Sequence, residues 1–183
     1  RDIAALRGGV SLLQSQAACP FRAYAEGFLH VDDLPHCQAG LDARMHGMMV
    51  HAIMQEVMQR YPSHGALKGL EHEGSFPFFD QLIHGTIERF RLKHPMMIRP
   101  PFDIVLLDNL HQLLREWLAV ELARPPFTVV SCEQKVTLSF GDWSIRMRID
   151  RIDRLASGQY LIIDYKTGLA TQDYWGDRPL APQ

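Results

Sequence analysis

A glycine-containing turn between two alternating apolar segments constrains the fold of this chain more than any other feature. The turn is Ala156-Ser157-Gly158, and a three-residue loop with glycine at its left-handed position closes an antiparallel hairpin. Counting outward from the turn predicts that Asp150 lies opposite Asp164. Lys166 then shares the face of Asp164, because side chains alternate along a strand with a period of two.

The preceding turn predicts a third strand in the same sheet. Gly141-Asp142 is typical of a two-residue hairpin loop, and it places Glu133 opposite Asp150. A shift of one residue in either turn would send these acids to opposite faces. The predicted sheet carries a row of acids and, beside it, a row of bases: Glu133, Asp150 and Asp164, then Lys135, Arg148 and Lys166.

A row of acids across a sheet needs something to neutralise it. Directly opposed like charges cost about 0.2–1 kcal/mol per pair. A divalent cation removes that cost, and carboxylate oxygens are the ligands that Mg²⁺ prefers. A nearby lysine can then orient or deprotonate a water molecule. The alternative is a solvated strand edge, with Glu133 paired to Lys135 or Arg148.

The rest of the chain divides into a helical part and a strand part at Pro125-Pro126. Apolar residues spaced by threes and fours predict the helices, and alternation predicts the strands. The fold class is α/β in content, with helices first and then an antiparallel three-stranded meander. The predicted helices are 12–29 with a break at Pro20, 41–60, 78–93 and 103–123; the loops are 31–40 and 63–75; the strands are 128–140, 143–155 and 159–166.

Composition limits the class of protein. A chain of 183 residues with 46% hydrophobic and 22% charged residues can build one globular domain, or one domain with an arm. The net charge of −2 means that any nucleic-acid contact must come from local basic clusters. We expect no membrane span and no signal peptide. Three cysteines without a framework spacing favour a reducing compartment, the cytoplasm.

Four ordered segments resemble the RecB/AddB branch of the PD-(D/E)XK nucleases. They are 150–153 (Asp-Arg-Ile-Asp), 162–168 (Ile-Ile-Asp-Tyr-Lys-Thr-Gly), Gly47-Met48-Met49-Val50-His51 and the entry segment 11–28. The resemblance covers most of the chain. It implies a restriction-endonuclease-like core over 41–183, incomplete at its C-terminal end and cut from a longer protein, with 1–40 as an entry helix and loop arm.

The resemblance also implies roles for single residues. Asp150 and Asp164 would bind Mg²⁺ or Mn²⁺, together with His51 and the backbone carbonyl of Tyr165. Lys166 would be the catalytic lysine. The acid row adds Glu133 as a further ligand.

The chain departs from the family pattern at one point, just before the first aspartate. The usual glycine before the first aspartate is absent, and Met147 and Arg148 stand there. By the same resemblance, Gln183 would begin a Gln-x-x-x-Tyr motif whose tyrosine would lie past the last residue.

Cys19 matches the first cysteine ligand of an iron–sulfur cluster found in AddB-type members. The other three cysteine ligands of that cluster would also lie past the end. Two interpretations of Cys19 are open: a ligand of such a cluster in the full-length protein, or a small buried hydrophobic residue.

Together these features predict a metal-dependent deoxyribonuclease of exonuclease type, from a DNA repair or recombination enzyme. Its partners would be DNA and, by resemblance, a helicase subunit or domain. The residues expected to contact DNA are Lys135, Arg146, Arg148 and Gln183. The rival hypothesis is a degenerate nuclease fold that only binds DNA or acts as a scaffold. The presence of Asp150, Asp164 and Lys166 argues against it, and the missing glycine argues for it.

Overall fold

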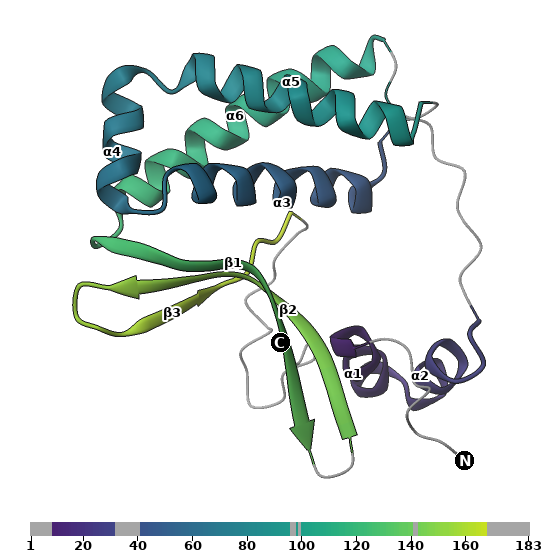
Figure 1. Ribbon diagram of the computed structural model, residues 1–183. Helices are drawn as coiled ribbons and strands as arrows, with labels where there is room; N and C mark the ends of the chain where they lie inside the picture. Colours follow the sequence, from purple (N-terminus) through teal and green to yellow (C-terminus); the bar gives the residue numbers. More distant parts are fainter. Residues whose placement is uncertain (1–8, 32–40, 96–97, 99, 141–142, 168–183) are drawn as a thin grey trace. The chain divides into compact units, whose positions relative to one another are not determined.

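The computed structural model describes residues 9–31, 41–95, 98, 100–140 and 143–167 (Figure 1). Two compact units divide these residues. The first holds α1, α2 and the hairpin segment Lys135–Arg148, and the second holds α3 to α6 with the rest of the sheet. The elements are α1 (Gly9–Ala18), α2 (Pro20–Gly27), α3 (Ala43–Arg60), α4 (His64–Glu73), α5 (Phe76–Lys93), α6 (Phe102–Ala123), β1 (Phe127–Phe140), β2 (Trp143–Leu155) and β3 (Tyr160–Ile163).

The first two helices are separated at Pro20, as the sequence predicts. Proline lacks an N–H and suits the first turn of a helix, so α1 ends at Ala18 and α2 begins at Pro20. The Ser15 hydroxyl donates to a Glu26 carboxylate oxygen at 2.7 Å and ties the two helices together. Cys19 is exposed, so its interpretation as a buried hydrophobic residue is wrong.

The methionine-rich helix α3 supplies the centre of the core in the second unit. Asp42 caps it by accepting a hydrogen bond from the Met45 N–H, and capping of this kind fixes a helix start. Met49, Ile53 and Val57 recur at every fourth position and are fully buried. Leucine, isoleucine and phenylalanine side chains from α4, α5 and α6 pack against them. Within the second unit, α3 lies along one face of the sheet (Figure 1).

One segment predicted to be a loop is a helix. The prediction for 63–75 followed its glycines and histidines, but α4 occupies most of that range. The Ser63 hydroxyl oxygen accepts from the Ala66 N–H at 3.2 Å and caps the helix. Leu67 and Leu70, three residues apart, are buried in the core. Burial of two leucines outweighs a helix cost of about 1 kcal/mol per glycine.

The predicted register of the β2–β3 hairpin is confirmed. The pairs run from Arg151 opposite Ile163 to Arg154 opposite Tyr160, and Gly158 has the positive φ of 85° that the turn requires. The strand order is β1-β2-β3. β3 ends at Ile163, three residues earlier than predicted, so Asp164 lies just beyond the ladder. The turn at 141–142 lies outside the described residues.

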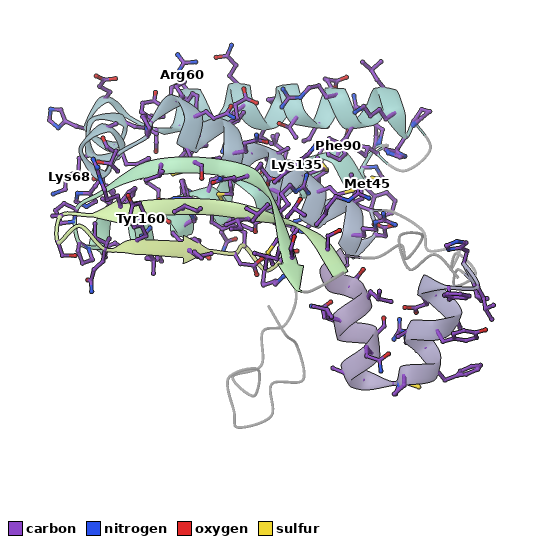
Figure 2. All side chains as sticks on the ribbon, turned by 60° about the horizontal axis from the view of Figure 1, so that its bottom comes forward. Met45, Arg60, Lys68, Phe90, Lys135 and Tyr160 are labelled. Carbon is purple, nitrogen blue, oxygen red and sulfur yellow. The ribbon has the colours of Figure 1, made fainter. Side chains whose placement is uncertain are left out.

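The edge strand β3 exposes apolar side chains on both faces. Tyr160, Leu161 and Ile162 are all exposed, and Tyr160 is labelled in Figure 2; such side chains are unusual on an edge strand. In the described part of the chain, none of the helices combines the length and apolar character that a bilayer crossing would need.

Burial predicts which leucines stabilise the second unit. Leu110 on α6 is fully buried, whereas Leu92 on α5 is 84% exposed. We expect Leu110→Ala to lower the free energy of unfolding by about 2–5 kcal/mol, because it leaves a cavity. Leu92→Ala should change it by less than about 0.5 kcal/mol. Urea denaturation measures both values, and equal losses would contradict the assignment of this core.

Candidate metal centre

Three side chains from three elements of the second unit meet at one point. His51 comes from α3, Glu133 from β1 and Asp150 from β2, and one ligand atom from each lies within 4.8 Å of the others. The Nδ1 atom of His51 is 3.4 Å from Asp150 Oδ1 and 3.6 Å from Glu133 Oε1. The Asp150 and Glu133 side chains are largely buried, at 8% and 13% exposure. Burial and convergence together make a candidate cation site.

Glu133 enters this site through an unusual backbone conformation. Its φ is 53°, a left-handed value that costs a non-glycine residue about 1–3 kcal/mol and persists only where neighbouring structure enforces it. The usual alternation of side chains along β1 is broken here. Cys132 packs against the helical core, and the next residue, Glu133, also turns toward the helices, where it meets His51 of α3. The sequence carries no signal for this conformation.

The backbone of Tyr165 holds two of the three side chains in place. Its N–H donates to Asp150 Oδ2 at 2.8 Å. Its carbonyl oxygen lies 2.9 Å from His51 Nε2. A carbonyl only accepts hydrogen bonds, so Nε2 carries the proton and Nδ1 faces the two carboxylates. Fixing one ring nitrogen in this way is how proteins orient a histidine that binds a metal through the other.

His51 and Asp150 shift each other's pKa in the direction that favours their charged forms. The hydrogen bond to Asp150 raises the pKa of His51 above its usual value, against the effect of burial, and the Tyr165 carbonyl and Glu133 add to the rise. Burial alone would raise the pKa of Asp150, but His51, the Tyr165 N–H and Lys166 lower it overall. The contacts that bring the carboxylates close to His51 thus also favour its protonated form when no cation is bound.

Asp164 and Lys166 form a separate pair. The Lys166 Nζ atom lies 3.0 Å from Asp164 Oδ2, and both side chains are about half exposed, at 53% and 45%. Their contact agrees with the predicted shared face. Asp164 is not one of the three residues whose ligand atoms meet, because the chain leaves the ladder after Ile163. Asp150 instead bonds to the Tyr165 N–H.

Gly47 allows the segment after β3 to run beside α3. A Cβ atom built on Gly47 would lie 3.2 Å from the Thr167 hydroxyl oxygen, a spacing tighter than ordinary van der Waals contact. Gly47 precedes His51 by about one helical turn. The spacing that suggested a motif thus has a local physical reason, since a side chain here would press on the segment that carries Tyr165 and Lys166.

The remaining predicted residues fall elsewhere. Lys135, Arg146 and Arg148 are exposed and belong to the first unit. Gln183 lies outside the described residues. The Tyr165 carbonyl, expected as a ligand, contacts the His51 ring.

The donor set suits a hard divalent cation. Two carboxylates and one imidazole offer oxygen and nitrogen donors. Carboxylate oxygens favour Mg²⁺ and Mn²⁺, and an imidazole is accepted by Mn²⁺ and later transition metals. The residues therefore fit a divalent cation, and three protein ligands would leave coordination positions for water or substrate oxygens.

Comparison with protein-family models identifies the family of the chain. The family model described as the PD-(D/E)XK nuclease superfamily matches residues 9–180, nearly the whole chain. No curated protein shows significant similarity to the chain. The family match covers the helices, the sheet and all three residues of the cluster.

The raised pKa of His51 predicts how metal affinity depends on pH. A cation needs the deprotonated Nδ1, so protons compete with it up to a higher pH than for an ordinary imidazole. We expect Mn²⁺ affinity, measured by calorimetry, to rise with pH until His51 is neutral. His51→Gln should bind at least about tenfold more weakly and lose this part of the pH dependence.

His46→Gln serves as the control for this experiment. His46 lies on the same helix but outside the cluster, so its replacement should leave affinity and pH profile unchanged. Equal affinities for the two variants would show that His51 binds no cation.

Proposed function

Since the chain belongs to the PD-(D/E)XK nuclease superfamily, we propose that it is a metal-dependent deoxyribonuclease domain of RecB/AddB type. Its activity is that of an exonuclease in DNA repair or recombination. The observation that carries the proposal is the convergence of His51, Glu133 and Asp150 on one point, held by the Tyr165 backbone.

His51, Glu133 and Asp150 hold Mg²⁺ or Mn²⁺ in this proposal. When bound, the cation lowers the pKa of a water molecule and stabilises negative charge on the phosphate. The protein supplies the orientation. The Tyr165 N–H holds Asp150 Oδ2, so that Oδ1 stays directed toward His51 Nδ1, and the lowered pKa keeps this carboxylate ionised at neutral pH.

Lys166 and Asp164 complete the proposed catalytic group. Both side chains are about half exposed, so they are accessible to a phosphodiester that approaches from solvent. The Lys166 ammonium can orient the attacking water by donating a hydrogen bond to its oxygen, and the ion pair with Asp164 keeps Lys166 near the site. Asp164 is the acid best placed to act as a further ligand, because it adjoins Tyr165.

DNA contact is assigned to basic residues on the hairpin of the first unit. Lys135, Arg146 and Arg148 are exposed, and cations of this kind position a nucleic acid through its phosphates without reading its sequence. Because the net charge of the chain is −2, attraction to the phosphates has to come from local basic residues such as these. A helicase partner, a cytoplasmic location and a role for Gln183 are proposed from the family resemblance alone.

The rival function is a non-catalytic DNA-binding or scaffold module. The feature that favours it is Met147-Arg148 where related nucleases carry a glycine. A degenerate fold has no need for a buried cluster of ionisable side chains, because buried charges are costly unless they are paired or bind a metal. Glu133, Asp150 and His51 retain such a cluster, which favours catalysis.

Cleavage of linear DNA tests the two functions directly. We expect the full-length protein to degrade linear DNA with Mg²⁺ or Mn²⁺ and to lose activity with a chelator. Asp150→Asn and Lys166→Met should each lower the cleavage rate by at least about 100-fold, since each removes several kcal/mol of stabilisation of the transition state. Release of acid-soluble nucleotides measures the rate.

Asp108→Asn and Lys68→Met are matched controls, because both residues are exposed on helices of the same unit. They should retain the cleavage rate of the unmodified protein. DNA binding without cleavage under any divalent metal would favour the scaffold function instead.

A further inference from the structure

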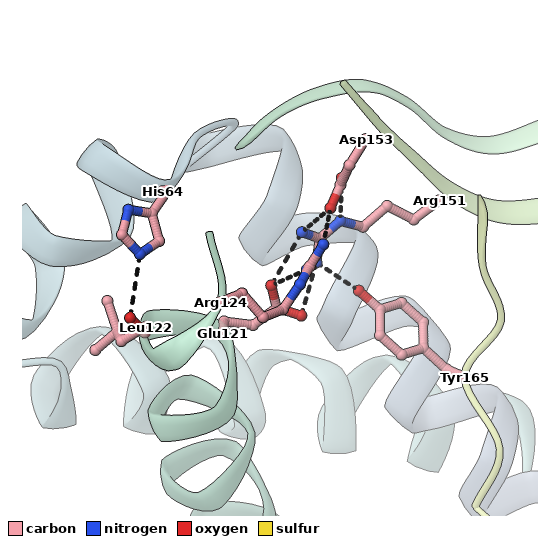
Figure 3. A network of polar contacts seen from close by, with 7 residues as sticks. All are labelled: His64, Glu121, Leu122, Arg124, Arg151, Asp153 and Tyr165. Carbon is pink, nitrogen blue, oxygen red and sulfur yellow. Dashed lines mark hydrogen bonds and ion pairs between the residues drawn. The ribbon is translucent and has the colours of Figure 1, made fainter. Parts of the chain in front are cut away.

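A buried arginine beside the candidate metal centre uses all its hydrogen-bonding capacity. Arg151 on β2 is fully buried, and a guanidinium has five N–H donors. Figure 3 shows where they go. Two donate to Asp153 at 2.6 and 2.7 Å, two to Glu121 at 3.1 and 3.0 Å, and one to the Tyr165 hydroxyl at 3.0 Å.

The acids around Arg151 are held by a second arginine. Arg124, which follows α6, pairs with Glu121 and lies 2.8 Å from Asp153 Oδ2. Both guanidiniums also lie over the ring of Phe127, at 4.7 Å for Arg151 and 4.5 Å for Arg124. The two guanidiniums and the two carboxylates balance in charge, so each buried charge in the network has a partner of opposite sign.

Tyr165 is the residue that connects this network to the metal centre. Its hydroxyl contacts Arg151. Its backbone N–H and carbonyl contact Asp150 and His51, and its ring meets the His51 ring edge-on. The segment that carries Tyr165 is no longer paired as a strand, because the β2–β3 ladder ends at Ile163. The hydroxyl contact and the packing of the ring against the core therefore help to hold this residue beside the sheet.

We propose that Arg151 and Tyr165 are positioning residues for the metal centre. Arg151 fixes the Tyr165 hydroxyl, and the Tyr165 backbone then orients the His51 imidazole and the Asp150 carboxylate for a cation. The inference rests on the proposed function, in which these two side chains bind a cation. It adds a buried arginine and a half-buried tyrosine, which orient the site through the Tyr165 backbone.

Tyr165→Phe in the full-length protein tests the proposal with the smallest change. The variant keeps the ring and the backbone and removes only the oxygen that Arg151 binds. We expect Mn²⁺ affinity to fall by about tenfold, as when other groups that orient metal ligands are lost. DNA cleavage should fall at limiting Mn²⁺ and recover at saturating Mn²⁺, because the ligands themselves remain.

A second readout needs no metal. In the metal-free protein, NMR titration of the His51 ring should show its pKa shifted toward the ordinary value in Tyr165→Phe, since the contacts that raise it depend on the Tyr165 backbone and on Asp150. Circular dichroism should show that the variant retains its secondary structure. A role limited to stability would move neither the titration of His51 nor the Mn²⁺ affinity.

Tyr160→Phe is the matched control, because Tyr160 loses the same oxygen on β3 but is 66% exposed. It should keep the Mn²⁺ affinity and the His51 titration of the unmodified protein. Identical values for Tyr165→Phe and Tyr160→Phe would overturn the proposal.

Arg151→Lys gives an independent comparison, with the exposed Arg154→Lys on the same strand as its control. A lysine keeps the charge but cannot supply five donors in a fixed fork. We expect it to weaken Mn²⁺ binding at least as much as Tyr165→Phe. If Arg151→Lys fails to fold, the pair of tyrosine variants decides the question.

The experiments separate this inference from the proposed function. Lack of Mn²⁺ binding and of DNA cleavage by the unmodified protein would contradict the proposed function. The His51 titration in Tyr165→Phe would still support or overturn the positioning role, because it is measured without metal.

Discussion

The rest of the second unit depends on the ion pairs and hydrogen bonds of one buried group, the guanidinium of Arg151. A buried charge is costly unless it is paired and fully hydrogen-bonded. Arg151 meets this condition with Glu121 from α6, Asp153 from its own strand and Tyr165 from the segment after β3. It therefore joins the helical layer, the sheet and the site. Loss of one acid would leave a buried charge uncompensated, at a cost of about 3–5 kcal/mol.

The candidate metal centre next to the Arg151 network is balanced differently. Its acids are Glu133 and Asp150, and its neutralising group is His51, whose pKa is raised by their proximity. That proton stabilises the metal-free protein at low pH, and its contribution is lost as pH rises through the raised pKa. A cation can take the place of the proton at higher pH. The Arg151 network thus pairs its charges within the protein, whereas His51, Glu133 and Asp150 form a cluster that could hold a cation.

Sequence reasoning succeeded where local rules apply and failed where distant residues decide. The Gly158 turn and strand alternation predicted the β2–β3 register, because turn geometry and pleating act over a few residues. The helix α4 was missed, because its glycines obscured Leu67 and Leu70. Its cap, Ser63, was the available signal. The left-handed conformation of Glu133 had no signal at all.

The sequence by itself determined which residues can carry the chemistry: two aspartates and a lysine near one hairpin, and a histidine one turn after Gly47. Tertiary structure decided which of them meet. It brought His51 and Glu133 to Asp150, paired Asp164 with Lys166 and gave Arg151 a partner thirty residues away in Glu121. The physical reason is that local propensities fix the direction of a side chain, whereas the need to pair buried charge couples positions that are far apart in the sequence.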